Sequence, residues 1–133
     1  MRVHHLVVGL LTVSFIAALT APVWGTQKIG DKLAERYKLD PKKVCALCHD
    51  ASKGEPGSRN LNKFGKDFDG AYSKQKKGSD RVAKTIEAIA GEDADGDGAT
   101  NLEELSLGTQ PGDAKSAPAA DKLAEYRKAN PKK

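Results

Sequence analysis

The segment "PKKVCALCHDASKG", residues 41–54, holds Cys45, Cys48 and His49 in the order C-x-x-C-H. This is the attachment pattern of a c-type haem, in which two thiols add to the haem vinyl groups and the adjacent histidine binds the iron. A redox C-x-x-C pair is the alternative, but that use normally accompanies a βαβ pattern, and no strand-like alternation lies nearby. The motif therefore predicts one covalent haem, which in so small a chain would form most of the core.

Residues 1–25 predict a secretory signal that is removed. Arg2 precedes an apolar run from Leu6 to Ala21, and Gly25 lies at a plausible cleavage point. The run is short for a membrane span, which needs about 20 apolar residues. We expect a mature chain of residues 26–133 in the periplasm or outside the cell, with no membrane span after signal removal.

The face of the iron opposite His49 lacks an ordinary ligand. Methionine or a second histidine is usual there, but the only ones in the chain are Met1, His4 and His5, all in the predicted signal. Five-coordinate iron or bound water is the simplest expectation. The other candidates are a lysine with a lowered pKa, a tyrosine or a new terminal amine, from Lys53, Lys63, Lys66, Tyr37, Tyr72 and Thr26.

Charge is segregated along the chain. Residues 26–90 hold 15 Lys and Arg against 9 Asp and Glu, residues 91–117 hold 1 against 7, and residues 118–133 hold 5 against 2. Nucleic acid is not expected as a partner, because the chain is exported and poor in aromatic residues. Lysines near a haem edge would instead steer a redox partner protein with an acidic docking surface.

Hydrophobic periodicity predicts an all-α domain. The segments expected to be helical are residues 31–39, 60–75, 79–92, a short stretch before Gly108, and part of the tail 118–133. Asp40-Pro41 is expected to end the first helix. Asn60 is expected to cap the second, and Ser79 or Asp80 the third.

The predicted helix 60–75 carries an aromatic stripe. Phe64, Phe68 and Tyr72 recur at four-residue steps and share one face. We expect this face to bind the haem, with plain core packing as the alternative. Gly65 inside the helix costs about 1 kcal/mol relative to alanine, and a porphyrin lying against the backbone is one hypothesis for its presence.

Two stretches of the chain are near-repeats. "DKLAERYKLDPKK" (31–43) and "DKLAEYRKANPKK" (121–133) match at nine of thirteen positions. The simpler interpretation is two similar amphipathic helices. The functional interpretation is that they make equivalent contacts, within the fold or in a homo-oligomer formed through the terminal helices.

The segment "DADGDGATNLEE" (93–104) matches the calcium-loop pattern D-x-[DN]-x-[DN]-G-x5-E. The expected ligands are Asp93, Asp95, Asp97, the Ala99 carbonyl, Asn101 and Glu104, with the sharp turn at Gly98. Thr100 stands at position 8, where paired EF-hands usually carry an apolar residue. We therefore expect a solitary structural site with an affinity of roughly 10⁻⁴ to 10⁻³ M.

The segments "CALCH", "LNKFGKDF" and "EDADGDGATNLEELSLGTQPGD" together resemble those of small exported monohaem c-type cytochromes of bacteria. The last also resembles thrombospondin type 3 and dockerin repeats. The resemblance covers most of residues 41–117. It implies a mostly helical cytochrome c-like domain over residues 26–117, followed by the tail 118–133, that carries electrons outside the cytoplasm. The chain departs from ordinary class I cytochromes c in lacking a methionine ligand.

Three functions follow from these observations. The first is a single-electron carrier with one haem c and calcium, which is not an enzyme. The second is an open-site haem protein that binds small ligands or has peroxidase-like activity. The third is a calcium-dependent structural or assembly module in which the haem is secondary.

Overall fold

Helices form the secondary structure of the part of the chain that the structure describes. The computed structural model describes residues 27–50 and 60–131. The elements are α2 (Gln27–Tyr37), α3 (Val44–Cys48), α4 (Lys63–Lys74), α5 (Arg81–Ile89), α6 (Asn101–Leu107), the 3₁₀ turn η2 (Ala114–Ser116) and α7 (Ala120–Ala129). Within those ranges there is no β-strand, only one antiparallel bridge between His49 and Leu61. The expected all-α class is confirmed, and the predicted signal lies outside the described residues.

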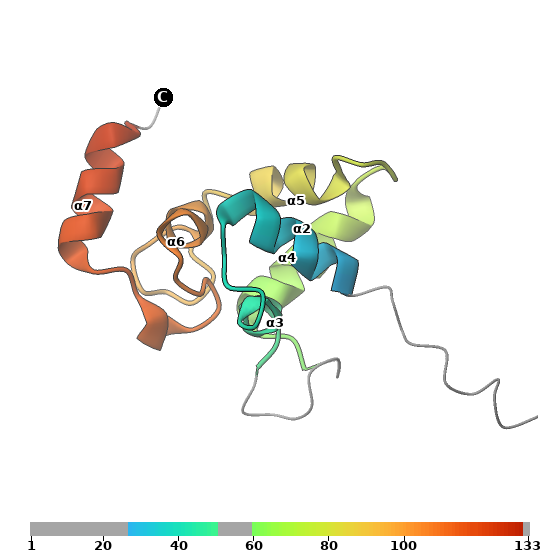
Figure 1. Ribbon diagram of the computed structural model, residues 1–133, viewed down its shortest axis with the longest axis horizontal. Coiled ribbons are helices and arrows are strands. Elements are labelled where there is room, and N and C mark those ends of the chain that lie inside the picture. Colours follow the sequence, from blue (N-terminus) through green and yellow to red (C-terminus); the bar gives the residue numbers. More distant parts are fainter. Residues whose placement is uncertain (1–26, 51–59, 132–133) are drawn as a thin grey trace, which may run out of the picture.

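The core lies among α2, α3, α4 and α5 (Figure 1). α4 packs against α3 and α5, and α2 packs against the same two helices. Leu105 of α6 also belongs to this core. The other buried apolar side chains are Leu33, Ala34, Val44, Leu47, Phe64, Phe68, Val82, Ile86 and Ile89. α2, α4 and α5 each bury an apolar stripe, as their sequence periodicity predicts.

The end of α2 differs from the prediction. The helix ends at Tyr37, ahead of the expected stop at Asp40-Pro41. Lys38 adopts a left-handed conformation with φ 54°, and the Leu39 N–H donates to the Ala34 carbonyl at 3.0 Å. This is the bond of a Schellman motif, which closes the helix without a proline. The predicted stop was therefore wrong.

The start of α4 is also corrected. Asn62, not Asn60, is the N-cap, and its Oδ1 accepts the Gly65 N–H at 2.8 Å. Asp80 precedes α5 as one of the two predicted caps, but its side chain makes no capping hydrogen bond. It pairs instead with Lys84 at 2.8 Å.

The near-repeat helices occupy different environments. α2 contributes Leu33 and Ala34 to the core, whereas α7 buries no residue and packs against α6 (Figure 1). In the described ranges, no helix is both long and apolar enough to cross a membrane.

Candidate functional site

The C-x-x-C-H motif forms α3, a short helix that the sequence did not predict. Val44 and Leu47 are buried and anchor it to the core. Cys45 is exposed and Cys48 is half-buried, and their spacing places both thiols on one side of the helix. His49 follows in extended conformation, with its N–H donating to the Cys45 carbonyl at 3.0 Å. The three predicted haem-attachment residues thus lie together on one element.

Asn62 holds α3 in place, and sequence reasoning missed this residue. Its Nδ2 donates to the Leu47 carbonyl at 2.9 Å and to the Ala46 carbonyl at 3.3 Å. Its backbone N–H donates to the Cys48 carbonyl at 3.0 Å. The last carbonyls of a helix have no partners within the helix, so Asn62 satisfies those of α3 while capping α4.

Gly65 brings the backbones of α3 and α4 together. A Cβ at this position would lie 2.1 Å from the carbonyl oxygen of Cys48. The space next to Gly65 is therefore filled by the motif's own backbone. The hypothesis of a porphyrin against this glycine is replaced by a helix–helix contact that only glycine permits.

The imidazole of His49 carries an unpartnered buried atom. Its Nδ1 is buried and has no hydrogen-bond partner. A buried polar atom without a partner costs about 1–3 kcal/mol, and the hydrogen bonds of the described residues do not explain this ring position. A histidine held beside two thiols fits the proximal ligand of a haem, for which Nε2 would be the binding atom.

The environment of Cys48 lowers the reactivity of its thiol. Burial raises the pKa of the Cys48 thiol to about 12, and the neighbouring Cys45 adds to the rise. Reactive C-x-x-C pairs instead have a thiol whose pKa is lowered by positive surroundings. The Cys48 thiol is therefore a weak nucleophile in the folded chain.

The aromatic stripe of α4 belongs to the protein core. Phe64 is fully buried, Phe68 is 5% exposed, and their ring centroids are 6.2 Å apart. Phe68 stacks on Tyr72 at 5.7 Å, and the Arg81 guanidinium lies 3.7 Å above the Tyr72 ring. The core-packing alternative accounts for these contacts, and contact of the three rings with haem stays a prediction.

The described candidates for the sixth iron ligand lie on two helices, α2 and α4. Lys63 is paired with Asp67 on α4, Lys66 is exposed, and Tyr37 packs against the core. Tyr72 stacks on Phe68, and the remaining two candidates, Lys53 and Thr26, lie outside the described residues.

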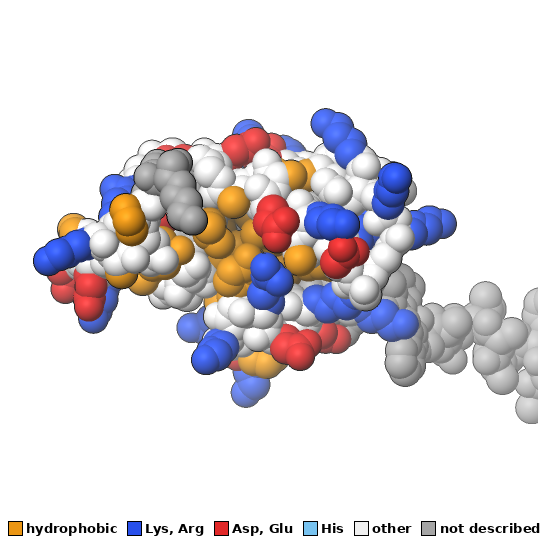
Figure 2. Space-filling model, turned by 90° about the horizontal axis from the view of Figure 1, so that it is seen from above, with side chains coloured by type: hydrophobic (Ala, Val, Ile, Leu, Met, Phe, Trp, Pro, Cys, Tyr) orange, Lys and Arg blue, Asp and Glu red, His pale blue; other side chains and the backbone are white. Residues whose placement is uncertain are grey.

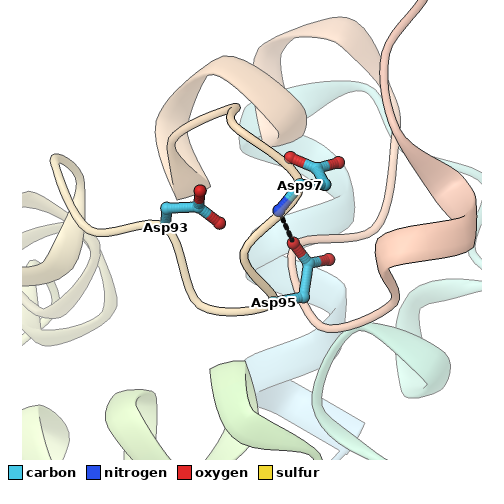
Figure 3. Close-up of side chains that lie close together, drawn as sticks. All are labelled: Asp93, Asp95 and Asp97. Carbon is cyan, nitrogen blue, oxygen red and sulfur yellow. Dashed lines mark hydrogen bonds between the residues drawn. The ribbon is translucent and has the colours of Figure 1, made fainter.

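The acidic loop draws three carboxylates together (Figure 3). Ligand oxygens of Asp93, Asp95 and Asp97 lie within 4.8 Å of one another. Asp93 accepts the N–H groups of Gly96 at 2.7 Å and of Gly98 at 2.9 Å. Both glycines have positive φ, 79° and 94°, so the loop turns where the pattern predicts.

Glu104 supplies the strongest indication of a cation. This side chain is fully buried, and its Oε2 has no hydrogen-bond partner. Burial, with repulsion from Asp95 and Asp97, raises its pKa to about 8. Oδ2 of Asp95 and of Asp97 are also buried without partners. Several buried carboxylate oxygens without donors fit a hard cation that prefers oxygen ligands, such as Ca²⁺.

Asn101 is engaged elsewhere in the protein. It is fully buried, its Oδ1 accepts the Ala94 N–H at 3.2 Å, and its Nδ2 donates to the Ile89 carbonyl at 2.8 Å. Ligation through this side chain would disturb bonds that join the loop to α5. The roles of Asn101 and of the Ala99 carbonyl as ligands stay predictions.

A second carboxylate beside the loop has a structural role. Glu103 forms a capping box with Thr100 at the start of α6. Its Oε1 also accepts from Arg127 Nε at 2.8 Å, and its Oε2 from Nη2 at 2.9 Å, while Nη2 donates to the Gly98 carbonyl at 2.8 Å. The sequence T-x-x-E is the signature of such a box, so this role of Thr100 and Glu103 was detectable from the sequence.

Comparison with protein-family models, with curated proteins and with solved structures found no match to this chain. The chemistry of the described residues is therefore the basis for assigning a function. They bring together a thiol pair beside a histidine and, separately, a carboxylate loop suited to a divalent cation.

Proposed function

We propose that this chain is an exported single-haem c-type cytochrome that carries single electrons and is stabilised by calcium. The observation that carries the proposal is the C-x-x-C-H motif on α3, with both thiols on one side and His49 beside them. Burial, which raises the pKa of Cys48, makes this thiol a weak nucleophile in the folded chain and so disfavours redox chemistry at that sulfur.

Each residue of the motif has a defined task in this function. Cys45 and Cys48 would hold the haem through thioether bonds, and His49 would bind its iron. The bound group would supply reversible one-electron transfer at the iron. Asn62 and Gly65 keep α3 at a fixed distance from α4. A rigid attachment helix limits structural change on electron transfer, which suits a carrier.

The surface suits a charged partner. Figure 2 shows one face with a hydrophobic area near its middle and Lys and Arg side chains along much of its outline, with Asp and Glu side chains interspersed among them. An apolar centre with a charged surround is the usual anatomy of a protein–protein interface. Positive charge would steer an acidic redox partner and accelerate the encounter.

Haem attachment is tested by producing the full chain in a bacterium that has the c-type haem maturation apparatus. We expect an intact mass that includes one haem and a pyridine haemochrome spectrum of the thioether-bound type. Cys45→Ser and Cys48→Ser should each lose one thioether bond. Ser73→Ala, an exposed position on α4, is the matched control. An intact mass without haem in the native chain contradicts the proposal.

An open-site haem protein is the second candidate. The composition favours this function. Apart from His49, the histidines and the only methionine are His4, His5 and Met1, which lie in the predicted signal and would be removed with it. Titration of the reduced protein with carbon monoxide separates the two functions. Ready binding at low concentration supports an open site, and no binding supports a carrier with a strong sixth ligand.

Calcium binding is tested by isothermal titration of the full chain. Glu104→Gln removes a buried carboxylate and should weaken binding at least tenfold, an effect of about 1.4 kcal/mol. Glu92→Gln is the control, because Glu92 is exposed and precedes the loop. Sedimentation with and without calcium tests the third candidate, and calcium-dependent assembly would favour it.

A further inference from the structure

Asn62 determines the backbone geometry of the helix that carries the C-x-x-C-H motif. α3 spans only 5 residues, too few to be stable alone. Its Ala46, Leu47 and Cys48 carbonyls all accept hydrogen bonds from Asn62. A displacement of Asn62 would leave these carbonyls without their partner, so the position of Asn62 controls the order of α3.

Gly112 lies directly against the Asn62 side chain. A Cβ at position 112 would be 2.3 Å from Asn62 Nδ2 and 2.4 Å from its Cγ. Gly112 does not have a positive φ, unlike Gly96, Gly98 and Gly108. The backbone conformation therefore does not require glycine at this position, whereas the contact with Asn62 does.

Residues 109–112 form a segment whose first residue, Thr109, contacts the predicted calcium ligand Glu104. The Thr109 N–H donates to the Glu104 carbonyl at 2.9 Å, and its hydroxyl donates to Glu104 Oε1 at 3.3 Å. Pro111 is among the fully buried residues, and the Asp113 N–H closes the turn on the Gln110 carbonyl at 3.1 Å. Hydrogen bonds thus join Glu104 to Thr109, the chain runs on from Thr109 to Gly112, and Gly112 lies against the Asn62 side chain that binds carbonyls of α3.

We infer that Asn62 is a positioning residue for the haem motif and that calcium in the loop 93–104 acts on it through residues 109–112. This inference rests on the proposed haem and calcium functions. Ligation of Glu104 would fix Thr109 and hold Gly112 against Asn62. Without the ion, the Glu104 side chain would not be fixed by ligation, and the same contacts would be held less firmly.

The test uses the haem-loaded full chain and measures amide hydrogen exchange at residues 45–49 and the haem reduction potential, each with and without calcium. In the native chain, calcium should slow exchange there about tenfold or more and shift the potential. Gly112→Ala should abolish both effects of calcium. Gly70→Ala is the control, because a Cβ at that position meets no atom within 4 Å. It should retain both effects.

A second variant tests Asn62 itself. Asn62→Asp keeps an oxygen for the Gly65 N–H but removes both side-chain donors to α3. Exchange at residues 45–49 should become faster whether or not calcium is present, while exchange in α4 changes less than about twofold. Equal acceleration in both helices would overturn the positioning role.

The outcomes separate this inference from the proposed function. Haem attachment and calcium affinity are measured first on the same samples, by mass and by titration. Exchange and potential at α3 that do not respond to calcium overturn the inference, whether the ion fails to bind or binds without effect. Responses in Gly112→Ala equal to those in Gly70→Ala overturn it too, even when haem and calcium are both bound.

Discussion

α2 and α7 have nearly the same sequence but are attached to the protein by different forces. Leu33 of α2 is 1% exposed and Ala34 is 8% exposed, so this helix is held by apolar burial. In α7 the equivalent Leu123 is half-buried and Ala124 is exposed. Residues that are identical in the two copies of the repeat are therefore buried to different extents.

The order of two residues accounts for the different contacts of the two arginines. α2 reads Arg36-Tyr37 where α7 reads Tyr126-Arg127. Successive residues are turned by about 100° around a helix, so the exchange moves the arginine to another face. Arg127 reaches Glu103 and the calcium loop, whereas Arg36 comes only within 3.9 Å of the exposed Glu87. The comparison shows that a near-repeat in sequence need not be a repeat in packing.

Truncation of the matching leucines tests this contrast most strongly. Leu33→Ala should destabilise the fold by about 2–5 kcal/mol, as expected for a fully buried leucine. Leu123→Ala should cost less than about 1 kcal/mol, because its side chain remains partly solvated in the folded state. Urea unfolding followed by circular dichroism measures both. Similar losses would mean that the two helices are held alike.

Calcium removal should affect α7 before α2. At a calcium concentration of a hundred times the dissociation constant, binding would stabilise the fold by about 2.7 kcal/mol, and chelation would remove that contribution. Arg127 contacts the loop through Gly98, so its helix should loosen first. Limited trypsin digestion, which cleaves after Lys and Arg in both helices, should then cut α7 earlier. Magnesium added after chelation serves as the control, and simultaneous cleavage contradicts the ordering.

Replacing each arginine in turn should show that the contacts of Arg127 stabilise the fold and that the contact of Arg36 does not. Arg127→Met leaves the buried Glu103 carboxylate without its charged donors and should cost about 1–3 kcal/mol. Arg36→Met should change the stability by less than about 0.5 kcal/mol, because its pair is exposed. Exchanging Tyr126 and Arg127 should cost as much as Arg127→Met. A stable exchanged variant would show that residue order does not matter.

The smallest effect expected is a dependence on acid. Hydrogen bonds from Arg127, and further ones from Thr100, lower the pKa of Glu103 from its ordinary 4.5 to about 2. A lowered pKa in the folded state stabilises the protein above about pH 4.5, and this contribution disappears as the pH falls toward about 2. The native chain should therefore lose more stability than Arg127→Met over this range. Parallel losses in the two proteins would contradict the contact.

Much of the fold was predictable from hydrophobic periodicity. The stripes that contain Phe64, Phe68, Val82, Ile86 and Ile89 lie in the core as their spacing predicts. Helix ends were less predictable: α2 ends at a left-handed lysine, a conformation that this residue type does not favour, and α4 begins where a distant segment pairs with it. Asn62 instead of Asn60 caps α4 because residues 60–62 are already paired with the end of α3, which no local pattern reveals.

The candidate sites divide in the same way. The C-x-x-C-H and acidic-loop patterns are local, and the structure brings together the residues of the first and the three aspartates of the second. The supporting contacts are not local: Asn62 reaches α3 across the chain, and Arg127 reaches Glu103 from the last helix. The sequence does not show why Gly65 and Gly112 are glycines, because the atoms that exclude a side chain at each position come from elsewhere in the chain.

The burial of Cys48 also bears on the order of maturation. A thiol whose pKa is raised to about 12 is a poor nucleophile at neutral pH once the chain has folded. In the unfolded chain the same sulfur is solvated and more reactive. We therefore expect covalent modification at Cys48 to be faster before α3 docks on α4 than after the chain has folded.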